Sequence, residues 1–94
     1  MTNWVYFIVG PRCVKIGTAR DVEQRLYALQ SASPFGLRLL GKMPGDRRLE
    51  QEFHKRWSEY RRRGEWFDLK PKLHQEIKLA LGAYQKKLLN LRGS

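Results

Sequence analysis

The chain has 94 residues, 41% hydrophobic and 30% charged, which excludes a second large core and an intrinsically disordered tail. Its formal net charge of +10, from 19 Lys and Arg against 9 Asp and Glu, destabilises the compact state by self-repulsion. Nucleic acid is the polyanion that most commonly relieves this cost, although a solubilising surface or a ribosomal or membrane-surface role stays open on charge alone. We therefore expect residues 1–94 to form one basic domain.

A hairpin and a helix are expected first along the chain. Residues 4–9 are β-branched and aromatic, which predicts a strand buried on both faces. Residues 13–17 predict a second strand, joined to the first by a tight connection of three or four residues. Asp21 followed by Gln24 resembles a capping box, so an amphipathic helix is expected over residues 21–31.

The rest of the chain predicts one more strand and two more helices. Residues 35–43 alternate imperfectly and predict a third strand, and the apolar residues of 47–60 recur every four positions, as in a helix. Residues 61–64 break this helix, and residues 65–68 are expected to be a short extended segment. The last helix is expected over residues 71–91, because a proline suits its first turn and an apolar stripe follows. The order ββαβαα predicts an α+β fold, with a three-stranded antiparallel sheet flanked by helices.

Four short blocks of sequence are similar to a known nuclease family. They are V-Y-F-I at residues 5–8, V-K-I-G-x-x-x-D-x-x-x-R-L at 14–26, L-E-x-x-x-H at 49–54 and R-G-E-W-F at 63–67. A single block occurs by chance, but four in this order and spacing are specific. Together they resemble the GIY-YIG nuclease superfamily, most closely a short branch found in phages and bacteria. The resemblance implies a GIY-YIG-like fold, with the motifs carried by residues 4–68.

The resemblance also implies which residues form the site. Tyr6 stands at the family's first tyrosine and Lys15 at its second, Arg25 stands at the arginine of the first helix, and Glu50 stands at the metal-binding glutamate. Trp4 replaces the family's glycine, just as Lys15 replaces a tyrosine. The asparagine that often closes the motif in larger relatives is missing.

Phosphodiester hydrolysis needs an activated water and a cation on the developing charge, and the same residues suit these tasks. Tyr6 is a candidate general base if the Lys15 ammonium on the paired strand lowers the pKa of its phenol. The planar guanidinium of Arg25 suits bidentate contact with a phosphate. Glu50 is the expected ligand of Mg²⁺ or Mn²⁺, and His54, one turn later on the same helix face, is the expected auxiliary contact to phosphate or leaving group.

Structural roles compete with several of these assignments. Arg25 has a helix partner in Asp21, and Glu50 has partners in Arg47 and His54. The segment that contains Glu65 is interpreted as a structural clamp. Basic residues near the expected cleft are interpreted as a strip that binds the nucleic-acid backbone. They are Arg20, Lys55, Arg61, Arg62 and Arg63.

The sequence therefore predicts a Mg²⁺-dependent endonuclease acting on DNA. Two alternatives stay open: a catalytically inactive DNA-binding module of the same fold, and a protein that dimerises or binds a partner through the helix at residues 71–91. The single cysteine, Cys13, excludes an internal disulfide and suits a reducing cytoplasm. The longest apolar run, residues 4–9, is too short to span a bilayer, so a soluble cytoplasmic protein without a membrane partner is expected.

Overall fold

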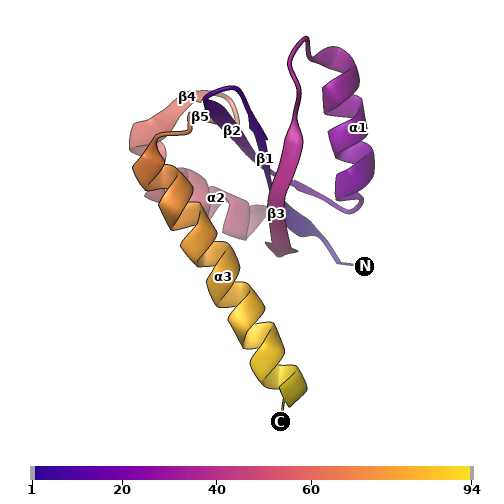
Figure 1. Cartoon of the computed structure of the whole chain (residues 1–94), viewed down its shortest axis with the longest axis vertical. Helices are drawn as coiled ribbons and strands as arrows, with labels where there is room; N and C mark the ends of the chain where they lie inside the picture. Colours follow the sequence, from indigo (N-terminus) through magenta and orange to yellow (C-terminus); the bar gives the residue numbers. More distant parts are fainter. Residues whose placement is uncertain (1, 94) are drawn as a thin grey trace.

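The computed structural model describes residues 2–93, and it describes the side chains of residues 2–91. A five-stranded antiparallel sheet in the order β3-β1-β2-β5-β4 carries three α-helices (Figure 1). Helix α1 lies against one face of the sheet, and α2 and α3 lie against the other. The elements are β1 (Trp4–Gly10), β2 (Cys13–Ala19), α1 (Val22–Ala32), β3 (Arg38–Pro44), α2 (Arg47–Arg56), the 3₁₀ turn Ser58–Tyr60, β4 (Arg61–Arg63), β5 (Trp66–Asp68) and α3 (Pro71–Gly93).

The α+β class and the antiparallel pairing are confirmed, but the expected strand count of three is wrong. Strand β5 pairs with β2, and β4 pairs with β5 at the edge of the sheet. Each has three residues, too few for a period-2 pattern to show in the sequence, and their partners supply the pairing. The arginine run 61–63, read as a helix breaker, is instead an edge strand whose charges oppose pairing with another chain.

Other boundaries differ in smaller ways. The hairpin connection has two residues, Pro11 and Arg12, rather than three or four, and Arg12 takes a left-handed conformation with φ of 60°. Asp21 is the N-cap of α1, as expected, and its side chain accepts a hydrogen bond from the backbone N–H of Gln24. The second helix is shorter than expected, because its α-helical part ends at Arg56 and a 3₁₀ turn follows.

The pairing register of the hairpin decides which residues face which helix. Directly opposed residues of an antiparallel pair share a face of the sheet. Phe7 is opposite Ile16 and both belong to the core under α2 and α3. Tyr6 is opposite Gly17, and Tyr6 belongs to the smaller cluster under α1. Lys15 is also on the α1 face, two positions along β2 from Gly17.

The main core is built around three aromatic rings. Phe53 and Trp57 of α2 stack with ring centroids 5.0 Å apart, and Phe7 meets both rings edge-on. From α3, Leu73 and Ile77 are fully buried against this cluster. These contacts fix α2 and the first half of α3 on one face of the sheet.

The apolar stripe of α3 has two different environments. Its first half is covered by the sheet, and the side chain of Leu81 approaches Gly41 of β3 so closely that a methyl carbon placed there would lie 2.6 Å from Leu81 Cδ1. Its second half extends away from the sheet (Figure 1), where Leu88 and Leu89 are 37% and 66% exposed. No helix in the described part of the chain has the length and hydropathy needed to span a bilayer.

Candidate functional site

Gly17 of β2 leaves a space that two polar side chains occupy. A methyl carbon placed on Gly17 would lie 2.5 Å from Tyr6 Oη and 2.8 Å from Glu65 Oε1. Both oxygens therefore lie over the same residue, and they are no farther apart than the sum of these two distances. Only glycine fits at this position, because any side chain would displace the phenol or the carboxylate.

The phenol of Tyr6 is buried, with 1% of the residue exposed. Burial raises its pKa to about 12, and the negative charge of Glu65 adds to the rise. The positive charge of Arg25 acts in the opposite direction, and Glu50 makes a further small contribution that raises the pKa. The sequence argument expected Lys15 to lower this pKa, and the direction is wrong because burial and carboxylates dominate around the phenol.

Lys15 neutralises Glu65 instead of acting on the phenol. Its Nζ lies 3.0 Å from Glu65 Oε1, and it also lies 5.5 Å from the ring centroid of Trp66. Lys15 is opposite Ile8 in the register, whereas Tyr6 is opposite Gly17. The lysine therefore holds the carboxylate that stands beside Tyr6.

Glu50 approaches the same end of β2 from the other face of the sheet. It is 3% exposed, and Thr18 Oγ1 donates a hydrogen bond to its Oε1 at 3.2 Å. Thr18 is opposite Val5 and so faces α2. Strand β5 pairs with β2 only at residues 13–15, so within the described chain residues 17–19 have a strand neighbour on the β1 side alone. Tyr6 and Glu50 thus meet this open edge of β2 from opposite faces.

His54 binds the backbone of β2. It is 8% exposed, its Nε2 lies 2.9 Å from the carbonyl oxygen of Ile16, and its ring meets Phe67 edge-on at 4.9 Å. A carbonyl oxygen only accepts hydrogen bonds, so Nε2 is the donor. The contact anchors α2 to β2 one turn after Glu50. The auxiliary contact to phosphate expected of His54 therefore competes with a hydrogen bond already made inside the protein.

Arg25 lines a shallow hollow where β2 runs into α1. Arg20 shares its wall, and the other lining residues come from the same β2–α1 junction. Arg25 is exposed, and none of the ion pairs among the described residues involves it. The expected competitor Asp21 instead caps α1. Two guanidinium groups that form no ion pair with the described residues thus line an open hollow, and the charge of one of them, Arg25, reaches Tyr6.

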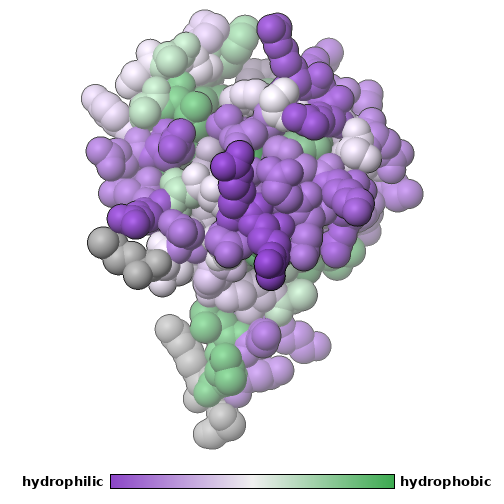
Figure 2. Space-filling view, turned by 180° about the vertical axis from the view of Figure 1, so that it is seen from behind, coloured by the Kyte–Doolittle hydropathy of each residue, from purple (hydrophilic) through white to green (hydrophobic). Residues whose placement is uncertain are grey.

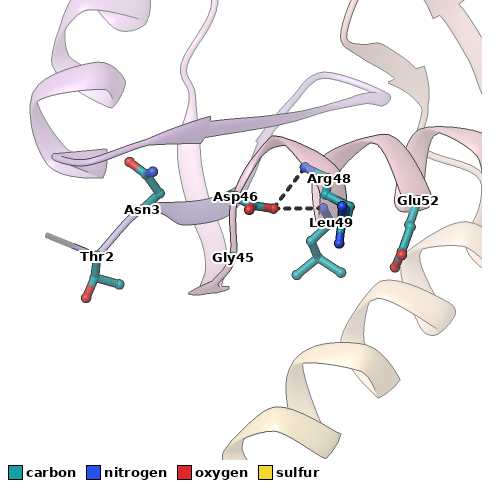
Figure 3. A pocket seen from close by; sticks show the side chains of 7 residues that line it. All are labelled: Thr2, Asn3, Gly45, Asp46, Arg48, Leu49 and Glu52. Carbon is teal, nitrogen blue, oxygen red and sulfur yellow. Dashed lines mark hydrogen bonds between the residues drawn. The ribbon is translucent and has the colours of Figure 1, made fainter.

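A second hollow lies at the N-terminal end of α2 (Figure 3). The Asp46 carboxylate at its centre already accepts hydrogen bonds from the backbone N–H groups of Arg48 and Leu49. Glu52 adds a second carboxylate to the wall. Arg48 also lines this hollow, but the two carboxylates and the occupied helix donors make it a less favourable phosphate site than the hollow beside Arg25.

The remaining basic residues expected to bind nucleic acid are all exposed. Lys55 is on α2 and Arg63 is on β4, and the other two are engaged locally: Arg61 Nε donates to the carbonyl of Gly64 at 2.9 Å, and Arg62 pairs with Asp68. Hydrophilic residues cover most of the molecular body seen from behind, while hydrophobic residues gather on the protruding end of α3 (Figure 2). The basic residues expected to bind nucleic acid therefore lie on several elements: the β2–α1 junction, α2 and β4.

The donor atoms present suit one hard cation with few protein ligands. Among the described residues no group of three or more His, Cys, Asp or Glu side chains is placed to hold a metal. Mg²⁺ is nevertheless bound by one or two carboxylates when waters and substrate phosphates complete its shell. Glu50, with the Thr18 hydroxyl beside it, fits that pattern.

Sequence reasoning missed two members of this site. Thr18 gave no signal, because a threonine in a strand is ordinary. Glu65 was assigned a structural role, yet the structure places it between Lys15 and Gly17. The available signal was its position directly after Gly64, which has a φ of 58° in the turn that joins β4 to β5.

Comparison with models of known families shows to which family the chain belongs. The model of the T5orf172 domain matches residues 3–82, most of the chain. Neither the curated proteins nor the solved structures give a match. Domains of this family occur in phage and bacterial proteins related to nucleases, which agrees with a nuclease-related or DNA-binding role. The chain belongs to the T5orf172 domain family.

Proposed function

We propose that this protein is a metal-dependent endonuclease of GIY-YIG type that hydrolyses phosphodiester bonds in DNA. The observation that carries the proposal is the gathering of four groups at the open edge of β2. Tyr6 and Glu65 share the space beside Gly17, and the charges of Arg25 and Glu50 both act on the Tyr6 phenol. An acid–base group, a cation for phosphate and a buried carboxylate are the parts that phosphodiester hydrolysis requires.

Each group has a proposed task. Arg25, together with Arg20 in the same hollow, binds the phosphate on either side of the bond to be cut. Glu50, oriented by Thr18, holds Mg²⁺ or Mn²⁺. When bound, this ion neutralises charge on the phosphate and polarises water. Tyr6, with a pKa of about 12, keeps its proton at neutral pH and packs beside the Glu65 carboxylate over Gly17, which helps to position that carboxylate.

DNA is the proposed partner because the net positive charge of the protein is large and would attract a phosphate backbone of any sequence. The net charge of +10 and the exposed guanidinium groups suit a phosphate backbone. The described surface gives no element arranged to read bases, so we expect recognition of backbone and shape rather than sequence. Binding should weaken steeply as salt rises.

The test is cleavage of supercoiled plasmid with Mg²⁺ or Mn²⁺ and with chelator. Glu50→Gln should lower the rate on the order of 100-fold or more, because the carboxylate that holds the ion is lost. Glu52→Gln is the matched control: it removes one exposed negative charge from the same helix and should cut at the wild-type rate. Folding of both variants is checked by circular dichroism.

Two results would contradict the proposal. Cutting that survives Glu50→Gln at an undiminished rate would show a contaminating nuclease. Salt-dependent DNA binding without any metal-dependent cutting would instead establish the catalytically inactive DNA-binding module, which the protonated state of Tyr6 at neutral pH also allows.

A further inference from the structure

Of the two polar groups beside Gly17, the Glu65 carboxylate is accessible to solvent and the Tyr6 phenol is not. The Glu65 side chain is 38% exposed, whereas Tyr6 is 1% exposed. A nucleophilic water must touch the group that takes its proton. Tyr6 offers water almost no surface, and with a pKa of about 12 only about one phenol in 10⁵ is ionised at neutral pH. Tyr6 is therefore poorly suited to deprotonate water in this structure.

The Glu65 carboxylate is positioned by one main-chain hydrogen bond, one ion pair and the space left at Gly17. The backbone N–H of Ile16 donates to the Glu65 carbonyl at 3.0 Å, which fixes the main chain beside β2. The Lys15 ammonium holds Oε1 at 3.0 Å. The absence of a side chain at Gly17 lets the same oxygen stand over β2 next to the Tyr6 hydroxyl. The main-chain hydrogen bond and the ion pair thus direct this carboxylate toward Gly17.

We propose that Glu65 is the general base of this site, an inference that rests on the proposed nuclease function. Glu65 takes a proton from a water molecule, and the O–H electron pair forms the new bond to phosphorus. The P–O bond to the leaving oxygen breaks, and that oxygen takes a proton from solvent. The proton on Glu65 then passes to bulk water. Lys15 orients the carboxylate, and the exposed Arg25 guanidinium binds an oxygen of the phosphate.

Chemical rescue tests this assignment with a readout that a structural role would not move. Under single-turnover conditions, Glu65→Gln should lower the cleavage rate on the order of 10²- to 10⁴-fold. Its affinity for DNA in chelator should stay within about threefold of wild type, because the exposed guanidinium groups still bind the backbone. Glu65→Ala should regain activity when formate is added, since formate supplies the missing carboxylate.

The matched control is Asp68→Asn on β5, three residues after Glu65. It removes a carboxylate of similar exposure, 40% against 38%, whose ion pair with Arg62 lies outside the site. This variant should cut at the wild-type rate with or without formate. Thermal unfolding of Glu65→Gln and Asp68→Asn shows whether either change acts through folding.

The outcomes separate this inference from the function on which it rests. If Glu50→Gln abolishes cutting while Glu65→Gln stays within about threefold of wild type, the nuclease function stands and the assignment of the base is wrong. An inactive Glu65→Ala that formate does not rescue also overturns it, because the residue then only positions others. If the wild-type protein does not cut, both proposals fall together.

Discussion

The two faces of the β1–β2 hairpin have opposite properties. The face under α2 and α3 is closed by the rings of Phe7, Phe53 and Trp57, with no room between them. The face under α1 is apolar only in part, and at Gly17 its packing gives way to a phenol and a carboxylate. The two faces therefore differ in how tightly they are packed, although Glu50 reaches the open edge of β2 from the α2 face. Substitutions in the ring cluster should act mainly on stability, whereas substitutions beside Gly17 should act on both stability and cutting.

The largest expected effect comes from breaking the aromatic side of this comparison. Trp57→Ala should lower the free energy of unfolding by about 3–5 kcal/mol, because it removes a fully buried ring from a stacked cluster. Urea unfolding followed by circular dichroism measures this. Leu89→Ala on the exposed half of α3 is the control and should change the free energy by less than about 0.5 kcal/mol. Equal losses in the two variants would show that the ring cluster is not the source of stability.

An intermediate loss of stability, together with a loss of activity, is expected from a substitution at Gly17. Gly17→Ala should cost about 1–3 kcal/mol, since the added methyl overlaps Tyr6 Oη and Glu65 Oε1. It should also abolish metal-dependent cutting by displacing both groups. Gly36→Ala is the control, because a methyl carbon there meets nothing within 4 Å. If Gly17→Ala were as stable and as active as the wild type, the close packing of Tyr6 and Glu65 over Gly17 would not matter for stability or cutting.

A smaller effect on the free energy of unfolding is expected at high pH, because the pKa of Tyr6 is raised in the folded state. The folded pKa of Tyr6 is about 12, against ~10 in an unfolded chain. Below pH ~10 both states hold the proton, so the stability is fully present. As pH rises from ~10 toward 12 the unfolded chain releases its proton first, and stability is lost. At about pH 11 this loss is about 1.4 kcal/mol.

Comparison with Tyr6→Phe isolates this term. The groups that face the phenol are Glu65, Arg25 and Glu50, with Lys15 and Lys42 on the flanking strands, and all are common to both proteins. The wild type should lose stability relative to the variant between about pH 10 and 11, measured by urea unfolding. Parallel curves would mean that burial does not raise this pKa.

Local patterns accounted for much of the fold. The β-branched run of β1, the Asp21 cap of α1 and the proline that opens α3 each act over a few neighbouring residues, and the structure places them as expected. The strands β4 and β5 were not recognised, because a three-residue strand exists only through its partner. The length of the hairpin turn was also set by pairing, since Gly10 opposes Cys13.

The candidate site divides in the same way. Spacing and motif order selected Tyr6, Lys15, Arg25 and Glu50. In the structure Lys15 pairs with Glu65 beside the Tyr6 phenol, and the charges of Arg25 and Glu50 act on that phenol. Their mutual electrostatics could not be predicted. Whether Lys15 acts on the phenol or on a carboxylate depends on a residue fifty positions later in the chain.

The amino-acid sequence alone was enough to establish the basic charge, the α+β class and the residue types available for phosphate chemistry, and the family match also rests on it. Only the tertiary structure decided that Tyr6 is buried with a raised pKa, that Glu65 stands between Lys15 and Gly17, and that half of α3 is left uncovered. The physical reason is the distance along the chain over which each kind of interaction acts. Capping, turn and strand preferences act between near neighbours, whereas burial and the pairing of charges depend on which distant segments meet.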